Sequence, residues 1–195
     1  MYVPAVEGAD ERNGERVLIA MAGLPGAGKS TVAEALGRRL AAPVVSVDPI
    51  EAAMRRAGVA PGQPTGLAAY VVAEAVADGV LALGQNVIVD AVNAVEAARG
   101  QWRALAARRR VPVVFLEVVC ADRAVHRGRL AARRRGIAGF PEPEWAAVER
   151  LRAEFEPWPG EGAEGSRRPE RLVLDSLDEV ELNVSTALGF LGAVS

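Results

Sequence analysis

Hydrophobic residues lie along the chain in short runs, separated by longer segments in which apolar and polar positions mix. The runs are rich in Val, Ile and Leu and show no alternation of apolar and polar positions. This pattern is typical of parallel strands that are buried on both faces. We expect strands over residues 16–22, 43–47, 86–89, 111–119 and 171–174.

The longer segments carry apolar residues at helical spacing. We expect helices over residues 30–40, 50–57, 66–83, 94–109, 122–135, 144–155 and 178–191. Gly84 is placed to end the third of these helices, and Asp178 is placed to cap the last. The alternation predicts a three-layer α/β fold in which helices cover both faces of a five-stranded, mostly parallel sheet. Ligands of such folds bind at the carboxyl ends of the strands.

The length of 195 residues fits one domain with a sizeable core. Residues 1–15 are polar and acidic, so we expect a flexible tail there and a single domain over residues 16–195. No apolar stretch is expected to reach the length of a membrane span. The one cysteine, Cys120, lies in an apolar run and is expected to be a buried thiol in a reducing compartment. These features predict a cytoplasmic protein.

The segment after the first expected strand matches G-x-x-x-x-G-K-[ST], the pattern of the phosphate-binding loop (P-loop). Its residues are Gly23, Leu24, Pro25, Gly26, Ala27, Gly28, Lys29, Ser30 and Thr31. The glycines allow backbone N–H groups to surround phosphates, Lys29 can reach the β- and γ-phosphates, and the Ser30 hydroxyl can ligate Mg²⁺. Lys29 is the only lysine among 23 basic residues, and a compact ammonium suits this position. An accidental glycine-rich turn is the alternative, which the strand before the loop and the helix after it do not favour.

Two acidic residues end expected strands, where this fold places its site. Asp48 is suited to orient or deprotonate an accepting hydroxyl, and Asp90 is suited to the shell of a metal ion. Each has a simpler alternative, because Asp48 could cap the helix over residues 50–57 and Asp90 the helix over residues 94–109. Asn93 is expected to be a cap or turn residue rather than a ligand.

Arginines cluster in the segment after the fourth expected strand. We expect approximately residues 122–145 to form a lid over a bound nucleotide, with Arg129 and Arg133 as its phosphate contacts. These arginines are four residues apart and would share one helix face. The glycine- and proline-rich residues 136–143 are suited to a mobile lid tip. A solvated, charged helix face is the alternative.

The remaining residue types that can carry chemistry are few. His126 is the only histidine and lacks the partners of a metal site or a catalytic triad, so we interpret it as structural or surface. Trp102, Trp145 and Trp158 are expected to pack or to line a pocket. Trp145 and Trp158 flank the expected lid and could border the site of the acceptor.

Five motifs in the chain resemble a known family when they are taken in order. They are Gly-Leu-Pro-Gly-Ala-Gly-Lys-Ser at 23–30, Ser-Val-Asp at 46–48, Val-Ile-Val-Asp-Ala-Val-Asn at 87–93, Arg-Gly-Arg-Leu-Ala-Ala-Arg at 127–133 and Glu-Phe-Glu-Pro-Trp at 154–158. This set is similar to the small P-loop kinases, which include the kinase domain of polynucleotide 5′-kinase and bacterial AAA-family ATPases. The stretch from Val47 to Met54 also resembles chloramphenicol phosphotransferase. The resemblance implies binding of ATP and Mg²⁺, transfer of the γ-phosphoryl group to a hydroxyl, Asp48 as the acceptor-side base, and Arg129 and Arg133 as lid residues.

We therefore expect an ATP-dependent kinase that phosphorylates a hydroxyl of a small molecule. A polynucleotide 5′-hydroxyl kinase is the nearest alternative. The net charge of −2 and the absence of a basic path after Asp48, apart from Arg55 and Arg56, do not favour a nucleic acid partner. A regulatory nucleotide-binding switch without an acceptor is the alternative of another class, and it requires Asp48 to be merely a helix cap. No membrane partner is expected.

Overall fold

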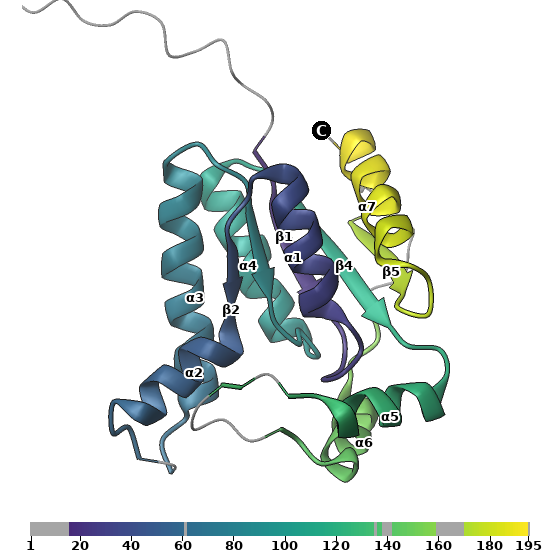
Figure 1. Cartoon of the computed structure of the whole chain (residues 1–195). Helices are drawn as coiled ribbons and strands as arrows, with labels where there is room; N and C mark the ends of the chain where they lie inside the picture. The colour runs from purple at the N-terminus through teal and green to yellow at the C-terminus, as the bar shows by residue number, and fades with distance from the viewer. Residues whose placement is uncertain (1–15, 61, 135, 138–141, 159–169, 195) are drawn as a thin grey trace, which may run out of the picture.

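A sheet of five parallel strands forms the centre of the computed structural model, which describes residues 16–60, 62–134, 136–137, 142–158 and 170–194 (Figure 1). The strands are β1 (Leu18–Ala22), β2 (Val44–Ser46), β3 (Val87–Asp90), β4 (Val113–Val119) and β5 (Arg171–Asp175). Their order across the sheet is β2-β3-β1-β4-β5, and every neighbouring pair is parallel. The predicted fold class and strands are confirmed. The expected tail over residues 1–15 lies outside the described residues.

Helices cover both faces of this sheet. They are α1 (Lys29–Leu40), α2 (Val47–Arg56), α3 (Thr65–Ala82), α4 (Glu96–Arg109), α5 (Arg123–Ala132), α6 (Trp145–Glu154) and α7 (Val180–Val194). Helices α1 and α7 pack on one face, and α3 and α4 pack on the other, which gives the predicted three layers. Helices α2, α5 and α6 lie beyond the carboxyl ends of the strands, at the lower end of the molecule in Figure 1.

The central strand β1 shows why the apolar runs lack alternation. Ile19 and Met21 belong to the core cluster under α1 and α7, whereas Leu18 and Ala20 belong to the cluster under α3 and α4. Successive side chains of a strand point to opposite faces of its sheet. A strand that is covered on both faces therefore needs an apolar residue at every position.

The helix ends test two of the sequence predictions. Gly84 has a φ of 79° and lies just beyond the end of α3, so the predicted stop is confirmed. The prediction that Asp178 caps the last helix is wrong, because α7 begins at Val180 and Glu179 occupies the position directly before it.

Helix α3 corrects the expectation that no apolar stretch reaches the length of a membrane span. Its 18 residues have a mean hydropathy of 1.4, which by length and composition alone is enough to cross a bilayer. Among the described residues it is the one helix of this kind. Core helices of water-soluble proteins reach the same values, and α3 packs a stripe of Ala69, Ala73, Ala77 and Leu81 against the sheet.

Candidate functional site

A cavity of about 630 Å³ lies at the carboxyl ends of the strands, between the P-loop, the start of α2 and the end of α5. Its lining includes all the residues for which the sequence predicts a catalytic or metal-binding role, namely Lys29, Ser30, Asp48, Asp90, Arg129 and Arg133. Glu34, Ser46 and Arg134 also line it. The fold therefore brings together side chains from four separate segments of the chain.

The P-loop follows β1 directly and adopts a conformation that requires glycine. Gly23 has a φ of 129°, and a Cβ atom at this position would lie 2.2 Å from the carbonyl oxygen of Val118. The N–H of Gly23 donates to the carbonyl of Val92 at 3.0 Å, which joins the loop to the segment after β3. Gly28 has a φ of 103° and immediately precedes α1. The loop thus turns tightly from the sheet into the helix.

The first turn of α1 has the features of an anion-binding helix end. Gly28 supplies no capping side chain, and the first turn contains no acidic residue. The first N–H groups of a helix have no partners within the helix and attract negative charge. Lys29 is the first residue of α1, is 8% exposed, and donates from Nζ to the carbonyl of Leu24 at 3.0 Å. A buried ammonium thus lies across the loop at the helix end.

Asp90 accepts hydrogen bonds from two hydroxyls at the floor of the cavity. Ser30 Oγ lies 2.7 Å from Asp90 Oδ2, and Ser46 Oγ lies 3.2 Å from the same oxygen. Asp90 ends β3, is 8% exposed and does not cap a helix, because α4 begins at Glu96. The alternative interpretation of Asp90 as a cap is therefore wrong. The sequence pattern assigned no role to Ser46, although this residue opens the Ser-Val-Asp motif at 46–48.

Asp48 lies inside the first turn of α2, which begins earlier than predicted. The helix starts at Val47 and includes Pro49, a residue that a first helical turn accepts because its N–H groups have no helical partners. Ser46 occupies the capping position, so the interpretation of Asp48 as the helix cap is wrong. Asp48 lines the large cavity and also a second one.

The second cavity has a volume of about 280 Å³ and adjoins the first. Lys29, Ser30, Asp48, Asp90 and Arg133 line both cavities. The second cavity also contains Pro25, Arg55, Ala91, Val92 and Pro143. The same polar groups therefore face two spaces, a larger one on the side of α1 and a smaller one on the side of α2.

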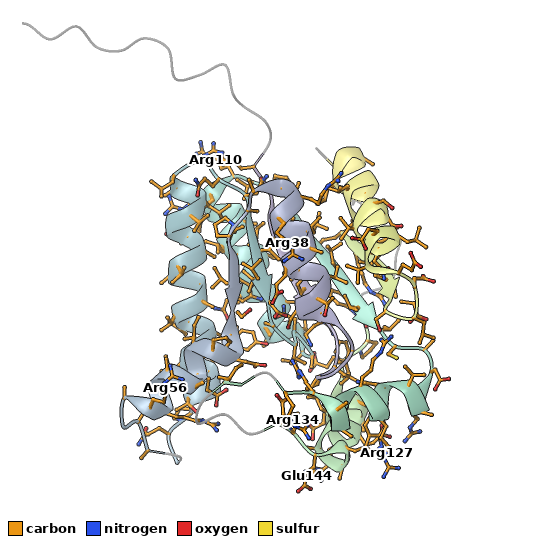
Figure 2. The ribbon with its side chains drawn as sticks, in the orientation of Figure 1. Arg38, Arg56, Arg110, Arg127, Arg134 and Glu144 are labelled. Atoms are coloured by element: carbon orange, nitrogen blue, oxygen red, sulfur yellow. The ribbon has the colours of Figure 1, made fainter. Side chains whose placement is uncertain are left out.

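The two predicted lid arginines reach the large cavity by different routes. Arg129 belongs to α5 and donates to Ser176 Oγ at 2.8 Å. Arg133 lies just after the end of α5 in extended backbone, with its guanidinium 3.6 Å from the carboxylate of Glu142. The prediction that the pair shares one helix face is therefore wrong. Figure 2 shows Arg127, on the same helix, at the edge turned away from the sheet. Residues 138–141 of the expected lid tip lie outside the described residues.

His126 connects helices α5 and α6 to the P-loop. It is 1% exposed, and its Nε2 lies 2.8 Å from the carbonyl oxygen of Pro25. Nδ1 lies 3.2 Å from Nη2 of Arg152 in α6, and the ring packs edge-on against Trp145. Burial lowers the pKa of His126, and a neutral ring can donate from Nε2 to the carbonyl while Nδ1 accepts from Arg152. The structural interpretation of His126 is confirmed.

Asn93 is a buried connection between β1 and α4. Its φ is 48°, its Nδ2 donates to the carbonyl of Met21 at 2.6 Å, and its Oδ1 accepts from Trp102 Nε1 at 2.8 Å. Its own N–H donates to the hydroxyl of Tyr70, whose pKa is raised by burial. Asn93 does not cap α4, which begins at Glu96, and its left-handed backbone and buried hydrogen bonds fix the segment that follows Asp90.

Arg99 joins the segment after Asp90 to the residues that follow α6. Its guanidinium is completely buried and lies 3.9 Å from the ring centre of Trp158. It donates to the backbone carbonyls of Asn93, Ala94, Glu156 and Pro157. Trp158 therefore belongs to the core, and Trp145 packs on His126. Neither tryptophan lines either of the two cavities described above.

Comparisons with known proteins agree with this arrangement. A sequence profile of a family described as AAA domain matches residues 18–158. A candidate kinase from Chloroflexus aurantiacus J-10-fl superposes with a TM-score of 0.70 and 19% identity, covering 90% of this chain and 98% of that one. A sugar kinase from Janibacter sp. HTCC2649 gives 0.66 and 18%, with 91% and 95% covered. Kti12 from Chaetomium thermophilum, in complex with ADP-AlF3, gives 0.65 and 21%, with 88% and 97% covered. These identities show a shared fold, that of the P-loop kinases. No curated protein sequence matches the chain.

Proposed function

Since the chain belongs to the AAA domain family, we propose that it is a kinase that transfers the γ-phosphoryl group of ATP to a hydroxyl of a small molecule. One observation carries this proposal. The buried ammonium of Lys29 and the Ser30–Asp90 pair lie between two adjoining cavities, and Asp48 lines both of them. A phosphoryl-transfer site needs this arrangement, with the phosphates on one side and the accepting hydroxyl on the other.

The large cavity is suited to the triphosphate. The uncapped start of α1 and the Lys29 ammonium supply positive charge, and Arg129 of α5 and Arg133 just after its end also line this cavity. Cations around the transferred group stabilise the charge that develops on its oxygens. The ADP-AlF3 complex of Kti12, which has the same fold, supports a nucleotide in this position.

The residues beside the P-loop fit a magnesium ion. Mg²⁺ prefers oxygen ligands, and in nucleotide sites it is held by one or two protein groups together with phosphate oxygens. The Ser30 hydroxyl and the Asp90 carboxylate, 2.7 Å apart, provide such a pair. Bound Mg²⁺ would supply positive charge that offsets the charge of the phosphates. Ser46 would hold the Asp90 carboxylate in place through its hydrogen bond.

Asp48 is the residue that we assign to the accepting hydroxyl. From the first turn of α2 its carboxylate can accept a hydrogen bond from the hydroxyl in the smaller cavity and take the proton as the new O–P bond forms. The bond between the γ-phosphorus and its bridging oxygen breaks, and the electron pair leaves with ADP. The volume of about 280 Å³ suits a small molecule. The sugar kinase with the same fold supports an acceptor of this size.

The two alternatives predict different behaviour. A nucleotide switch requires Asp48 to be merely a helix cap, and Ser46 occupies that position instead. A polynucleotide kinase requires a basic path for a strand, to which the acceptor cavity contributes Arg55 and Arg133. Arg55 is paired with Glu51 at 2.5 Å, which reduces its positive field toward a phosphate backbone.

A screen of acceptors tests the proposal. The full chain is incubated with γ-labelled ATP and Mg²⁺ and with sugars, aminoglycosides, chloramphenicol or 5′-hydroxyl oligonucleotides, and label on the acceptor is measured. We expect incorporation into a small hydroxyl compound that exceeds the rate of ATP hydrolysis without acceptor. Incorporation into oligonucleotides alone would establish the polynucleotide alternative. Tight ATP binding with no transfer to any compound would favour a switch.

A further inference from the structure

Helix α3 presents a completely apolar surface to the solvent. One side of the helix packs on the sheet, and the opposite side lies at the left edge of the molecule in Figure 1. Its exposed residues are all apolar, and the surface continues onto the residue directly after the helix. The full set is Leu67, Ala68, Val71, Val72, Ala75, Val76, Gly79 and Ala82 in α3, followed by Leu83. We call this surface the α3 face. Helices at the surface of a protein usually carry polar residues on their outer side, and continuous apolar patches mark interaction sites.

The charges of α3 are all directed away from this face. Glu74 and Asp78 are its only charged residues. Glu74 pairs with Arg108 at 2.6 Å, and Asp78 accepts from Arg109 Nε at 2.6 Å, so both lie along the border with α4. The α3 face therefore has a polar rim on one side and no charge within it. This is the usual composition of a contact surface, with an apolar centre and a polar border.

The shape of the α3 face fits another helix. Ala68, Ala75 and Ala82 recur every seven residues along its middle, which places them on one line, with Gly79 close to this line. Larger Val and Leu side chains stand on both sides, including Val71 and Val76, which are 57% and 46% exposed. A row of small residues between larger ones lets a second helix approach closely.

We propose that the occupant is a second copy of this chain, with the two α3 helices packed antiparallel about a two-fold axis near Ala75. The row is symmetric about this position, because Ala68 and Ala82 are equally distant from it. In an isologous pair Ala68 of one copy therefore meets Ala82 of the other.

Two further features favour this pairing. The first turn of α3 contains no acidic residue and its last turn no basic residue, so its end charges are uncompensated within the helix. An antiparallel partner places opposite helix ends side by side. The face offers five large side chains that are 39–79% exposed, namely Leu67, Val71, Val72, Val76 and Leu83, and two such faces together approach the roughly 1,000 Å² that a specific interface needs. None of these residues lines the two cavities, so pairing leaves the site accessible.

Sedimentation velocity of the full chain tests the proposal first. Between about 1 µM and about 100 µM protein we expect the mass to rise from that of a monomer to that of a dimer. Val76→Glu should keep the chain monomeric. Leu182→Glu is the matched control, because Leu182 is a similarly exposed apolar residue on α7, at 55%, and this variant should still dimerise. A wild type that remains monomeric, or equal loss of dimer in both variants, would overturn the proposal.

Cysteine cross-linking tests the register without disturbing the packing. Under mild oxidation Ala75→Cys should form a covalent dimer, because the two positions meet at the axis. Ala82→Cys is the control, since the two copies of this position lie about 20 Å apart in the antiparallel pair. Mixing Ala68→Cys with Ala82→Cys should restore the cross-link. Wild type supplies the background, because its one cysteine, Cys120, is buried. Equal cross-linking of Ala82→Cys and Ala75→Cys would refute the antiparallel pair. Binding of the monomer to phospholipid vesicles through the α3 face, without dimer formation, would also refute it.

Discussion

The Nε2 atom of His126 in α5 lies 2.8 Å from the carbonyl oxygen of Pro25, so this helix is joined to the phosphate-binding loop. On the other side of the ring Nδ1 accepts from Arg152 of α6. One neutral side chain therefore joins the loop to both α5 and α6. If the ring gained a proton, Nδ1 would face the guanidinium of Arg152 as a second donor, and this bond would be lost.

The stability of the protein should consequently depend on pH through His126. Burial lowers its pKa from the ordinary value of 6.5, and the charges of Arg152 and Lys29 act in the same direction, against the effect of the Pro25 carbonyl. The unfolded chain therefore binds more protons than the folded one as the pH falls through 6.5, and stability must decrease there. Chemical denaturation between about pH 7.5 and about pH 5.5 should show a steeper loss of unfolding free energy in wild type than in His126→Gln. The comparison is clean because His126 is the only histidine. Equal dependence of the unfolding free energy on pH in the two proteins would contradict this role of His126.

Replacement of Lys29 should remove catalysis. In Lys29→Ala the phosphates lose the buried ammonium that lies across the loop, and we expect ATP turnover to fall by about 100-fold or more. Lys29→Arg is the informative companion, because a planar guanidinium does not fit the position of a compact ammonium, and we expect it to be nearly as inactive. Initial rates at saturating ATP measure both. Activity of Lys29→Ala within a few-fold of wild type would exclude the assigned role.

Substitution of Asp48 should separate nucleotide binding from transfer. Asp48→Asn keeps the size of the side chain but cannot take a proton, so the affinity for ATP should persist while transfer falls by about 100-fold or more. Glu34→Gln is a matched control, since Glu34 is an exposed carboxylate of the same cavity on α1 and should tolerate the change. Calorimetric titration with an ATP analogue and single-turnover transfer measure the two steps. Undiminished transfer by Asp48→Asn would refute the assignment of the base.

The sequence was sufficient to predict the parts of the site that depend on local pattern. A P-loop between a strand and a helix requires Lys29 and Ser30 to lie at the helix start, and parallel pairing of β1 with β3 brings the end of β3 to the same edge. Asp90 therefore lies beside Ser30, in agreement with the site that was predicted from the sequence.

The positions that sequence reasoning missed depend on contacts between distant segments. Arg133 was predicted to line the site, but its backbone was not, because α5 ends at Ala132 whereas continuous helical spacing predicted a helix to residue 135. The partners of Arg99 are backbone carbonyls of two distant segments, and such acceptors leave no trace in a pattern of side chains. Ser46 acts on Asp90 from a neighbouring strand, and only the register of β2 against β3 shows it.

The Asp90 carboxylate should control the requirement for magnesium. Asp90→Asn weakens a charged ligand without changing its shape, so the Mg²⁺ concentration for half-maximal activity should rise by about tenfold or more. Ser46→Ala removes only one hydrogen bond to that carboxylate, and a smaller shift is expected. Magnesium titrations at fixed ATP measure both variants. An unchanged dependence on Mg²⁺ in Asp90→Asn would place this residue outside the metal shell.

A pair of glycine substitutions should show how tightly the loop is constrained. In Gly23→Ala the new Cβ would lie 2.2 Å from the carbonyl oxygen of Val118, and the φ of 129° is unfavourable for alanine. The backbone of β4 or of the loop must then shift. We therefore expect nucleotide binding to be lost and the free energy of unfolding to fall by about 2 kcal/mol or more. Gly100→Ala is the matched control within α4, because its Cβ meets nothing within 4 Å. This variant should gain about 0.5–1 kcal/mol from the better helix propensity of alanine. Denaturation curves and binding of an ATP analogue measure the pair, and equal effects of the two substitutions would show that the loop has more freedom than its contact with β4 implies.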